Sequence, residues 1–564
     1  MKRLLSHPAV LWAFVAVALF AWLGTRGLNE PDESRYAEVG REMAASGDWL
    51  MPRLNGFEHL QKPPLLYWTT ALSFRLFGVN EWAARLACAL PALGTLYLTW
   101  FLSTALFGPQ SRAAAVLILL SSCEFVLLSR ALTPDMMLTF WVTLAIACLV
   151  KHVTGGRRTL WRIGFFVAMG LGFLCKGPMA LVVPISAAVC WQVALRRRGE
   201  DLRLGWRSGL LISLGIGLSW FAIVALQHPK LADYFWRYEF RDRIFSSVHG
   251  RSQPFWFFVP VLLGGMLPWT PLLVAVLLCG WKALRAREDV PPETWLLAGW
   301  VGPPFLILSL SGSKLATYIL PLFPALALLM ARWCESHADG RAFRRVVGGS
   351  VVCALALSVA LPLVLVGLRW FAPLYRGVWF SPAFTVLLVL LIFLFAMLVR
   401  RQATPTAVLA LGCGATLLWV GLVTQADRLL VEEGGSVRPL ARIIERMPGA
   451  DSTEVFAYQV RANGFGFYLR RLISRTREQS AIVLPVEESQ KARVIDSIED
   501  YLDRLGSRPA LGVVGPKALK PDGLFATWQV LGRSGRYVLI ANDAATERGA
   551  AHEADATLRG DDGY

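Results

Sequence analysis

The chain is poor in charge and carries no recognisable metal-binding or disulfide pattern. Only 17% of its 564 residues are charged and 55% are hydrophobic, whereas soluble proteins average about 25% charged residues. Its nine cysteines stand singly in or beside apolar runs, and its seven histidines form no HExxH pattern. These spacings favour small apolar core residues over a zinc site or a disulfide scaffold. The composition therefore argues against an ordinary soluble fold.

Long apolar runs dominate instead and predict a polytopic α-helical membrane protein. Runs of about 17–25 residues recur, the length that crosses a bilayer, and the 22 Trp and 31 Phe suit membrane interfaces. No small-residue cleavage site follows the first run, so we interpret it as an uncleaved helix. About 13 transmembrane helices are expected, at 9–25, 84–106, 112–130, 135–151, 160–175, 178–195, 208–227, 256–280, 293–311, 315–333, 346–368, 381–399 and 405–424.

Basic residues set the expected orientation. Lys and Arg gather in alternate short connections, beginning with Lys2 and Arg3, and this set should be cytoplasmic. Two long outer loops then lie at 26–83 and 228–255 within a transmembrane domain of residues 1–424. The C-terminal segment falls on the same outer side.

Acidic residues stand where a membrane protein rarely needs them for folding. Asp32 and Glu33 follow the first span directly, and Asp135 opens the fourth span at its outer end. Asp135 can also be read as a simple helix N-cap, but its side of the membrane matches that of Asp32. Glu124 lies inside the third span, and an acid there indicates a function by default. These positions indicate chemistry on a membrane-borne substrate.

Basic residues in the outer loops have no topological use, so they indicate binding of anionic head groups. Arg grips phosphate bidentately and Lys acts as a point charge; the alternative is that these side chains extend to lipid head groups. Lys176, Lys314 and Tyr318 mark further outer turns or span entries. The loop cations are Arg35, Arg41, Arg53, Lys62, Arg75, Lys230, Arg237, Arg241, Arg243 and Arg251.

The first outer loop has helical spacing in two places. A helix beginning near Glu33 places Tyr36, Val39 and Met43 on one face, and we expect it to lie on the membrane surface. A second amphipathic stretch begins at Lys62 and runs through Tyr67. Together the two stretches predict a platform around a head group.

The character of the chain changes near residue 425, where charges become dense. Strands are predicted at 453–460, 510–514 and 537–541, a helix at 491–505, and a turn at 534–535. A small extracytoplasmic α/β domain over 425–543 and a disordered tail over 544–564 follow. Because the domain contains neither GxGxxG nor a P-loop, nucleotide binding is not expected.

Several separated motifs resemble the lipid A 4-amino-4-deoxy-L-arabinose transferase family, of the GT-C class of polyprenyl-phosphate-sugar glycosyltransferases. The resemblance covers most of the membrane region and is weak over the C-terminal domain. It is carried by Pro31–Glu38, Arg41–Met43, Ser46–Trp49, Lys62–Pro63, Tyr67–Trp68, Leu76–Gly78, Pro134–Asp135, Lys176–Gly177, Pro254–Trp256 and Lys314–Leu320.

The resemblance implies a donor sugar on undecaprenyl phosphate and a lipid A phosphate, or another outer-leaflet glycan, as acceptor. It places the chain in a bacterial inner membrane with a periplasmic C-terminal domain. Asp32 and Asp135 correspond to the essential carboxylates. The substrate-binding candidates are Glu33, Arg35, Lys62, Tyr67, Arg243, Lys314 and Tyr318.

Two departures from the family pattern bear on metal binding and on the substrate. Gln61 stands where the family often has Glu, and Phe240 where it often has His. Because Gln is a poor metal ligand and Phe is none, we predict no metal there, and no cofactor is expected. The same changes leave another sugar or acceptor open.

Two other classes of function remain alternatives. A transporter of lipid-linked sugar usually shows paired halves and broken mid-membrane helices, and this sequence has no internal repeat. A non-catalytic scaffold would not need Asp32, Asp135 and Lys62 to converge. Nucleic-acid binding is not supported by the net charge of +17, since much of that charge is topological.

Overall fold

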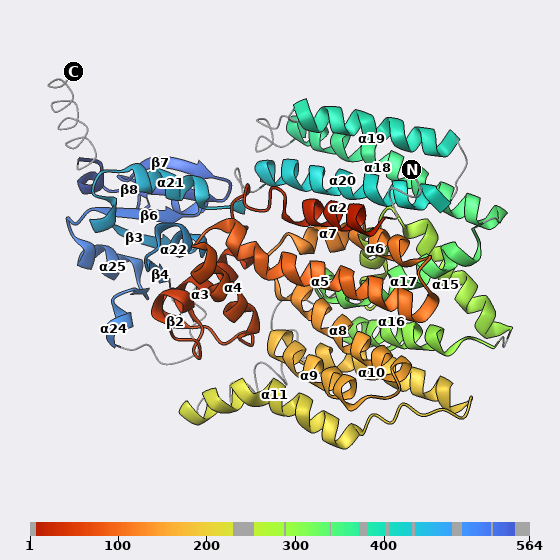
Figure 1. The fold of residues 1–564 in the computed structure, drawn as a ribbon. Helices are drawn as coiled ribbons and strands as arrows, with labels where there is room; N and C mark the ends of the chain where they lie inside the picture. The colour runs from red at the N-terminus through yellow and green to blue at the C-terminus, as the bar shows by residue number, and fades with distance from the viewer. Residues whose placement is uncertain are drawn as a thin grey trace.

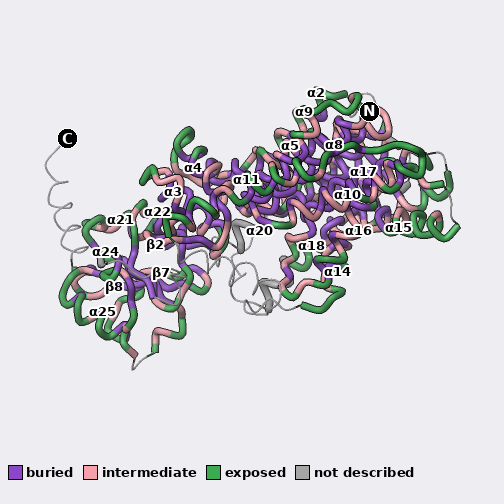
Figure 2. The backbone as a smooth tube through the Cα atoms, turned by 90° about the horizontal axis from the view of Figure 1, so that it is seen from below, coloured by how far each residue is buried: buried purple, intermediate pink, exposed green. Residues whose placement is uncertain are grey.

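A computed structural model describes residues 7–228, 253–286, 289–338, 340–371, 382–400, 405–430, 435–476, 488–520 and 523–547. The chain folds into a large helical bundle and a smaller region built on a β-sheet, with α3 and α4 between them (Figure 1). Figure 2 shows buried residues running through the middle of the bundle and, separately, along the strands.

Helices occupy all thirteen predicted spans. Eight described helices are long and apolar enough to cross a membrane, and nine spans result if α6 and α7, bent by 71°, count as one. The multi-pass helical architecture is confirmed, while the total of thirteen crossings stays a prediction. The helices are α2 Pro8–Phe20, α5 Glu81–Phe107, α6 Arg112–Leu120, α7 Cys123–Ser129, α8 Pro134–Thr154, α9 Thr159–Lys176, α10 Met179–Arg196, α11 Trp206–Gln227, α14 Phe258–Gly265, α15 Thr270–Arg285, α16 Pro292–Leu310, η2 Ala316–Leu322, α17 Phe323–Ser336, α18 Arg341–Phe371, α19 Pro382–Arg400 and α20 Pro405–Leu430.

The first outer loop folds into α3 (Asp32–Ser46), the short hairpin β1–β2 (Arg53–Leu54 and Phe57–Glu58) and α4 (Leu65–Phe77). Ten of the fifteen residues of α3 are buried, including Tyr36, Val39 and Met43. The helix packs against α4 and against α22 (Gly464–Leu469) of the C-terminal region. The prediction of a helix lying on the membrane surface is therefore wrong, because both of its faces meet protein.

The C-terminal region is a six-stranded mixed sheet in the order β5-β4-β3-β6-β8-β7. Strands β5, β4, β3 and β6 run parallel, and β8 and β7 form an antiparallel hairpin at one edge. Apolar residues of α21 and α22 cover one face of the sheet, and those of α25 cover the other. The bounds are β3 Glu454–Tyr458, β4 Ser474–Thr476, β5 Val494–Ile495, β6 Ala510–Val514, β7 Gln529–Ser534, β8 Tyr537–Ala541, α21 Arg438–Arg446, α24 Glu488–Lys491 and α25 Ile498–Leu505.

The predicted strands at 453–460, 510–514 and 537–541 are confirmed as β3, β6 and β8. The single helix predicted over 491–505 is wrong, since β5 interrupts it and α25 begins only at Ile498. Helix α20 also continues to Leu430, beyond the change in composition near residue 425. Beyond residue 547, the tail lies outside the described residues.

Two buried side chains of the first outer loop, Glu30 and Asn55, bind the C-terminal region. Glu30 accepts hydrogen bonds from the backbone N–H groups of Asn463 and Gly464, at 3.2 and 2.6 Å. Asn55, in the hairpin turn, exchanges two side-chain hydrogen bonds with the backbone of Ile473. Contacts more than 400 residues apart in sequence thus fix the position of α3.

Glu33 holds the start of α3 from the other side, and here the structure corrects its predicted substrate-binding role. Its carboxylate accepts bidentate hydrogen bonds from both Arg26 and Arg85, at 2.8–3.1 Å. The backbone N–H groups of Asn29 and Leu132 donate to the same oxygens, each at 3.0 Å. With six donors around a side chain only 3% exposed, no acceptor position remains for a ligand.

The two cations determine the ionisation of Glu33. Burial alone would raise its pKa, but the charges of Arg26 and Arg85 lower the pKa to about 2. Because this folded-state pKa lies below the ordinary value of 4.5, the group stabilises the fold above pH 4.5. That contribution is lost as the pH falls toward 2.

We predict that Glu33→Gln lowers the free energy of unfolding by about 3–5 kcal/mol, because it leaves two buried guanidinium groups without their counter-charge. Thermal unfolding of the detergent-purified protein measures the change. Glu200→Gln is the matched control, since the Arg157–Glu200 pair is 36% and 53% exposed and should contribute less than about 1 kcal/mol. Equal melting temperatures for the two variants would contradict a structural role for Glu33.

We also predict that Gly466→Ala loosens the C-terminal region from α3. A Cβ at Gly466 would lie 2.2 Å from Oε1 of Glu38, so either α22 or the Glu38 carboxylate, which Arg41 holds in place, must shift. Limited proteolysis should release the C-terminal region from the membrane helices faster than in the unmodified protein. At Gly515, whose added Cβ meets nothing closer than 3.6 Å, the same substitution should leave the proteolysis rate unchanged; no difference between the two variants would disprove the prediction.

Candidate functional site

The first half of the candidate site lies at the start of α3. Asp32 is 57% exposed and forms an ion pair with Arg35 one turn later. The Arg35 guanidinium carbon lies 5.2 Å from the centre of the Tyr36 ring. Its Nε is buried and has no hydrogen-bond partner among the described residues. Arg35 therefore retains a donor that an anionic ligand can use.

The second half lies at the ends of three bundle elements. Asp135, in the first turn of α8, accepts a short hydrogen bond from Nζ of Lys176, the last residue of α9. The same Nζ lies 4.5 Å from the centre of the Tyr318 ring in η2, a cation–π distance. Helix α8 packs against both α9 and η2, so the packing of the bundle holds the three side chains together.

Tyr36 connects the two halves electrostatically. Burial is the main reason that its pKa rises to about 12; Arg35 opposes the rise, whereas the charges of Asp32 and Asp135 add to it. The charges of both predicted catalytic carboxylates therefore act on one phenol, while their facing one outer cavity stays a prediction. At neutral pH this phenol keeps its proton and remains a hydrogen-bond donor.

An aromatic layer extends from Tyr36 into the first outer loop. The rings of Tyr36 and Tyr67 lie 6.0 Å apart, and that of His59 lies 6.5 Å from Tyr67. Burial, with the charges of Arg35, Arg475 and Lys62, lowers the pKa of His59 to about 3, so its imidazole is neutral. The structure thus places Tyr67 within the layer and Lys62, half-buried, close enough to influence it.

Lys314 has a different role from the one predicted. Its ammonium is buried and donates to the backbone oxygens of Gln253 and Ser311, at 2.9 and 2.5 Å. It therefore ties together two backbone segments instead of pointing at the cluster. Arg243, the remaining predicted phosphate contact, lies outside the described residues.

Three other predicted phosphate contacts also serve the fold. Arg41 pairs with Glu38, Arg53 pairs with Asp48, and Arg75 lies 5.1 Å from the centre of the Trp49 ring. Of the described outer-loop cations, Arg35 forms an ion pair with Asp32, and Lys62 lies close enough to His59 to influence its pKa. Among the described residues, no group of three or more His, Cys, Asp or Glu side chains could hold a metal ion.

Sequence reasoning did not assign Lys176, Tyr36 or His59 to the site. Lys176 had a usable signal, because it is a lysine at an outer span end on the same side as Asp135. Tyr36 was assigned only to an apolar helix face, and His59 carried no pattern at all. Their importance becomes visible only when the loop is folded against the bundle.

Comparisons with known proteins agree with this architecture. Residues 61–225 match the family model described as dolichyl-phosphate-mannose-protein mannosyltransferase. The crystal structure of ArnT from Cupriavidus metallidurans in the apo state has a TM-score of 0.79 at 26% identity and covers 95% of this chain and 98% of that chain. The form bound to undecaprenyl phosphate has a TM-score of 0.77, covering 95% and 97%. The GT-C type of fold is thereby confirmed.

Curated proteins similar in sequence to this chain share one enzyme name. An undecaprenyl phosphate-alpha-4-amino-4-deoxy-L-arabinose arabinosyl transferase of Edwardsiella ictaluri is 34% identical over 351 residues, covering 61% of this chain and 62% of the relative. The chain thus matches about three fifths of that relative's length. Transferase 1 of Sodalis glossinidius is 34% identical over 392 residues, covering 66% of this chain and 69% of that relative. This multi-pass membrane protein therefore belongs to the undecaprenyl phosphate-alpha-4-amino-4-deoxy-L-arabinose arabinosyl transferase family.

Proposed function

We propose that the chain is a membrane glycosyltransferase that moves 4-amino-4-deoxy-L-arabinose from undecaprenyl phosphate to a lipid A phosphate. The observation that carries the proposal is the convergence of Asp32–Arg35 and Asp135–Lys176 on Tyr36. It is supported by the likeness to ArnT, whose solved structure binds undecaprenyl phosphate. The reaction would take place at the periplasmic face of a bacterial inner membrane, with a cytoplasmic N-terminus and a periplasmic C-terminal domain.

The bond changes require little acid–base help. The bond between the anomeric carbon and the donor phosphate oxygen breaks, and its electron pair leaves with undecaprenyl phosphate. An oxygen of the acceptor phosphate, already anionic, forms the new bond to the same carbon. No proton has to move, so the barrier lies in the charge of the leaving group and in positive character at the sugar ring.

Cations of the site would stabilise the departing phosphate. Arg35, with its buried unpartnered Nε, and Lys62 approach from the first outer loop, and Lys176 approaches from the bundle. Lys176 is bound to Asp135 in the described state, so phosphate binding would have to share or replace that contact. A tyrosine that stays protonated, Tyr36, can donate a further hydrogen bond.

The two carboxylates would act on the sugar. Asp32 is exposed enough to meet a substrate, and Asp135 is buried beside Lys176. Negative charge near the anomeric carbon favours the positively charged transition state. We therefore place both side chains in catalytic roles, with Asp32 on the loop side and Asp135 on the bundle side.

Asp32→Asn should lower sugar transfer by about 100-fold or more, because it removes a transition-state charge while keeping the shape of the side chain. The readout is the mass spectrum of lipid A from cells lacking the protein and supplied with each variant; a pentosamine-sized addition should appear with the unmodified chain and be lost or strongly reduced with Asp32→Asn. Asp503→Asn, at an exposed position of α25, should keep the addition. Identical lipid A in all strains would mean that the acceptor or the sugar is wrong.

Lys176→Gln should likewise reduce transfer by about 100-fold, because an uncharged amide cannot stabilise the leaving phosphate. Lys151→Gln provides the matched control: this lysine lies near the opposite end of α8, also over an aromatic ring, that of Phe101 at 5.8 Å. Initial rates of the purified variants with undecaprenyl-phosphate sugar decide the question. Comparable rates for the two variants would remove Lys176 from the mechanism.

A further inference from the structure

One predicted membrane span is broken in the middle. Helices α6 and α7 meet at an angle of 71°, and Ser121 and Ser122 occupy the break. Ser122 Oγ donates to the Ile118 carbonyl at 2.7 Å, and the Trp269 indole N–H donates to Ser121 Oγ at 2.8 Å. Broken helices at membrane depth occur where the backbone is buried in protein or lines a site. The break places Glu124 in the first turn of α7.

Glu124 is buried, and in the part of the chain that the structure describes its carboxylate has no hydrogen-bond partner. The residue is 8% exposed, and neither carboxylate oxygen has a hydrogen-bond partner among the described residues. A Cβ added to Gly265 of α14 would lie 2.6 Å from its Oε2 and 2.9 Å from the Phe323 ring. Only a glycine at 265 therefore leaves room for this carboxylate.

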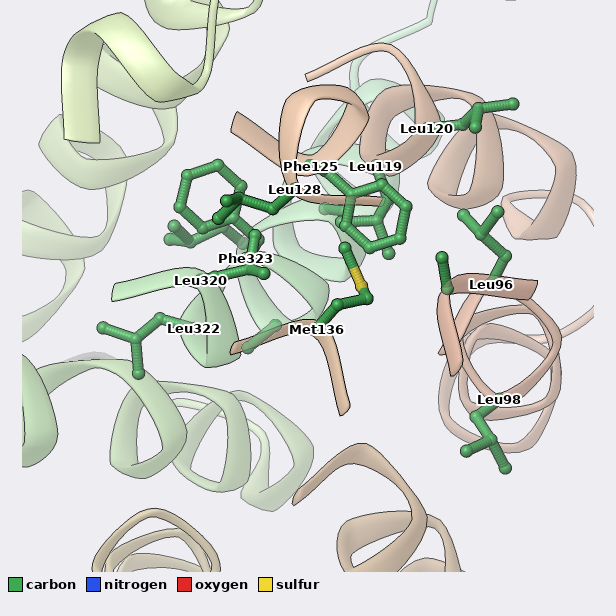
Figure 3. Close-up of a cluster of buried hydrophobic side chains, with 14 of the residues drawn as sticks. Leu96, Leu98, Leu119, Leu120, Phe125, Leu128, Met136, Leu320, Leu322 and Phe323 are labelled. Carbon is green, nitrogen blue, oxygen red and sulfur yellow. The ribbon is translucent and has the colours of Figure 1, made fainter. Parts of the chain in front are cut away.

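Buried apolar side chains lie near Glu124, among them Phe125, which follows it in α7, and Phe323, whose ring approaches the same side of Gly265. Figure 3 shows Phe125 and Leu128 of α7 gathered with Met136 of α8 and with Leu320 and Phe323, at the junction of η2 and α17. An acid among such side chains needs a compensating cation or a proton. The structure provides hydrocarbon on these sides and no ion pair in the part that it describes.

The charged groups that act on Glu124 are Asp135 and Lys176 of the candidate site. The described residues therefore bring two carboxyl groups to one ammonium group, and that ammonium group is already hydrogen-bonded to Asp135. Glu124 lies five residues before the end of α7 at Ser129, which is about 7.5 Å along the helix axis at 1.5 Å per residue. A cation bound beside Glu124 would supply the partner that the described residues do not.

We propose that Glu124 is a specificity residue, whose carboxylate binds the ammonium group of an amino-sugar donor. The inference rests on the proposed function and adds to it the residue that distinguishes an amino sugar from its hydroxyl counterpart. The relatives' name specifies a sugar with an amine at C4, and that amine is a cation at neutral pH. The Glu124 carboxylate is buried and has no hydrogen-bond partner among the described residues. It is influenced by Lys176, which would hold the donor phosphate. A carboxylate at this place would match the positive charge of the amine.

Binding is the first test, because it does not depend on turnover. Two donors are compared, undecaprenyl phosphate carrying 4-amino-4-deoxy-L-arabinose and undecaprenyl phosphate carrying L-arabinose, on the full chain in detergent. The unmodified protein should bind the amino donor at least about tenfold more tightly, as expected for a charged hydrogen bond in a buried site. Glu124→Gln should abolish that preference and leave affinity for the hydroxyl donor within about twofold.

Initial transfer rates with the same two donors provide the second readout. Glu124→Gln should raise KM for the amino donor with little change in kcat for the hydroxyl donor, and Glu124→Asp should recover part of the preference. A Glu124→Gln protein that still prefers the amino donor, or an unmodified protein with no preference in binding, would overturn the proposal. If the preference in binding depends on Glu124 but neither sugar is transferred to lipid A, the proposed transfer reaction fails while the amine subsite stands.

Discussion

The bonding of Glu33 to Arg26 and Arg85 is the constraint on which the candidate site depends. Arg85 is fully buried in α5 and also donates to the backbone carbonyls of Leu23, Arg26 and Gly27. One guanidinium thus fixes the chain where it leaves α2, and through Glu33 it fixes the first turn of α3. Asp32 and Arg35, on either side of Glu33, take their positions from this anchor. Glu33, a buried acid, thus orients the exposed Asp32 and the partly buried Arg35 and does not meet substrate itself.

The opposite side of α3 is held by the C-terminal region. Glu30 binds the backbone of α22, and Asn55 binds the strand end at Ile473. Burial is the main reason that the pKa of Glu30 rises to about 7, even though Ser34, Gly464, Arg475 and Asn463 oppose the rise. The helix is therefore positioned by the bundle at one end and by a separate α/β fold along its length. This double attachment brings the Asp32–Arg35 pair to the Asp135–Lys176 pair.

The sequence predicted much of this arrangement, for identifiable reasons. Apolar run lengths located a helix at each of the thirteen predicted spans, and the alternation of basic loops assigned Asp32, Asp135, Lys176 and Tyr318 to one side. The role of Glu33 could not be predicted, because its partners include a backbone N–H 99 residues away, at Leu132. The role of Lys314 was missed because it binds carbonyl oxygens, which carry no side-chain signal. In the C-terminal region, β4 and β5 are three and two residues long, too short for periodicity to register, and so the helix after β5 was predicted to begin too early.

The attachment of α3 to residues 463–475 also has a consequence for how the protein matures. Glu30 and Asn55 are synthesised near the start of translation, whereas their hydrogen-bonding partners emerge more than 400 residues later. Until then Glu30 and Asn55 have no C-terminal partners, and α3 lacks its second attachment. A nascent or truncated chain that ends before these partners would contain every membrane helix and the Glu33–Arg85 anchor, but α3 would be attached on one side only. The double attachment of the site is therefore complete only once residues 463–475 have been synthesised.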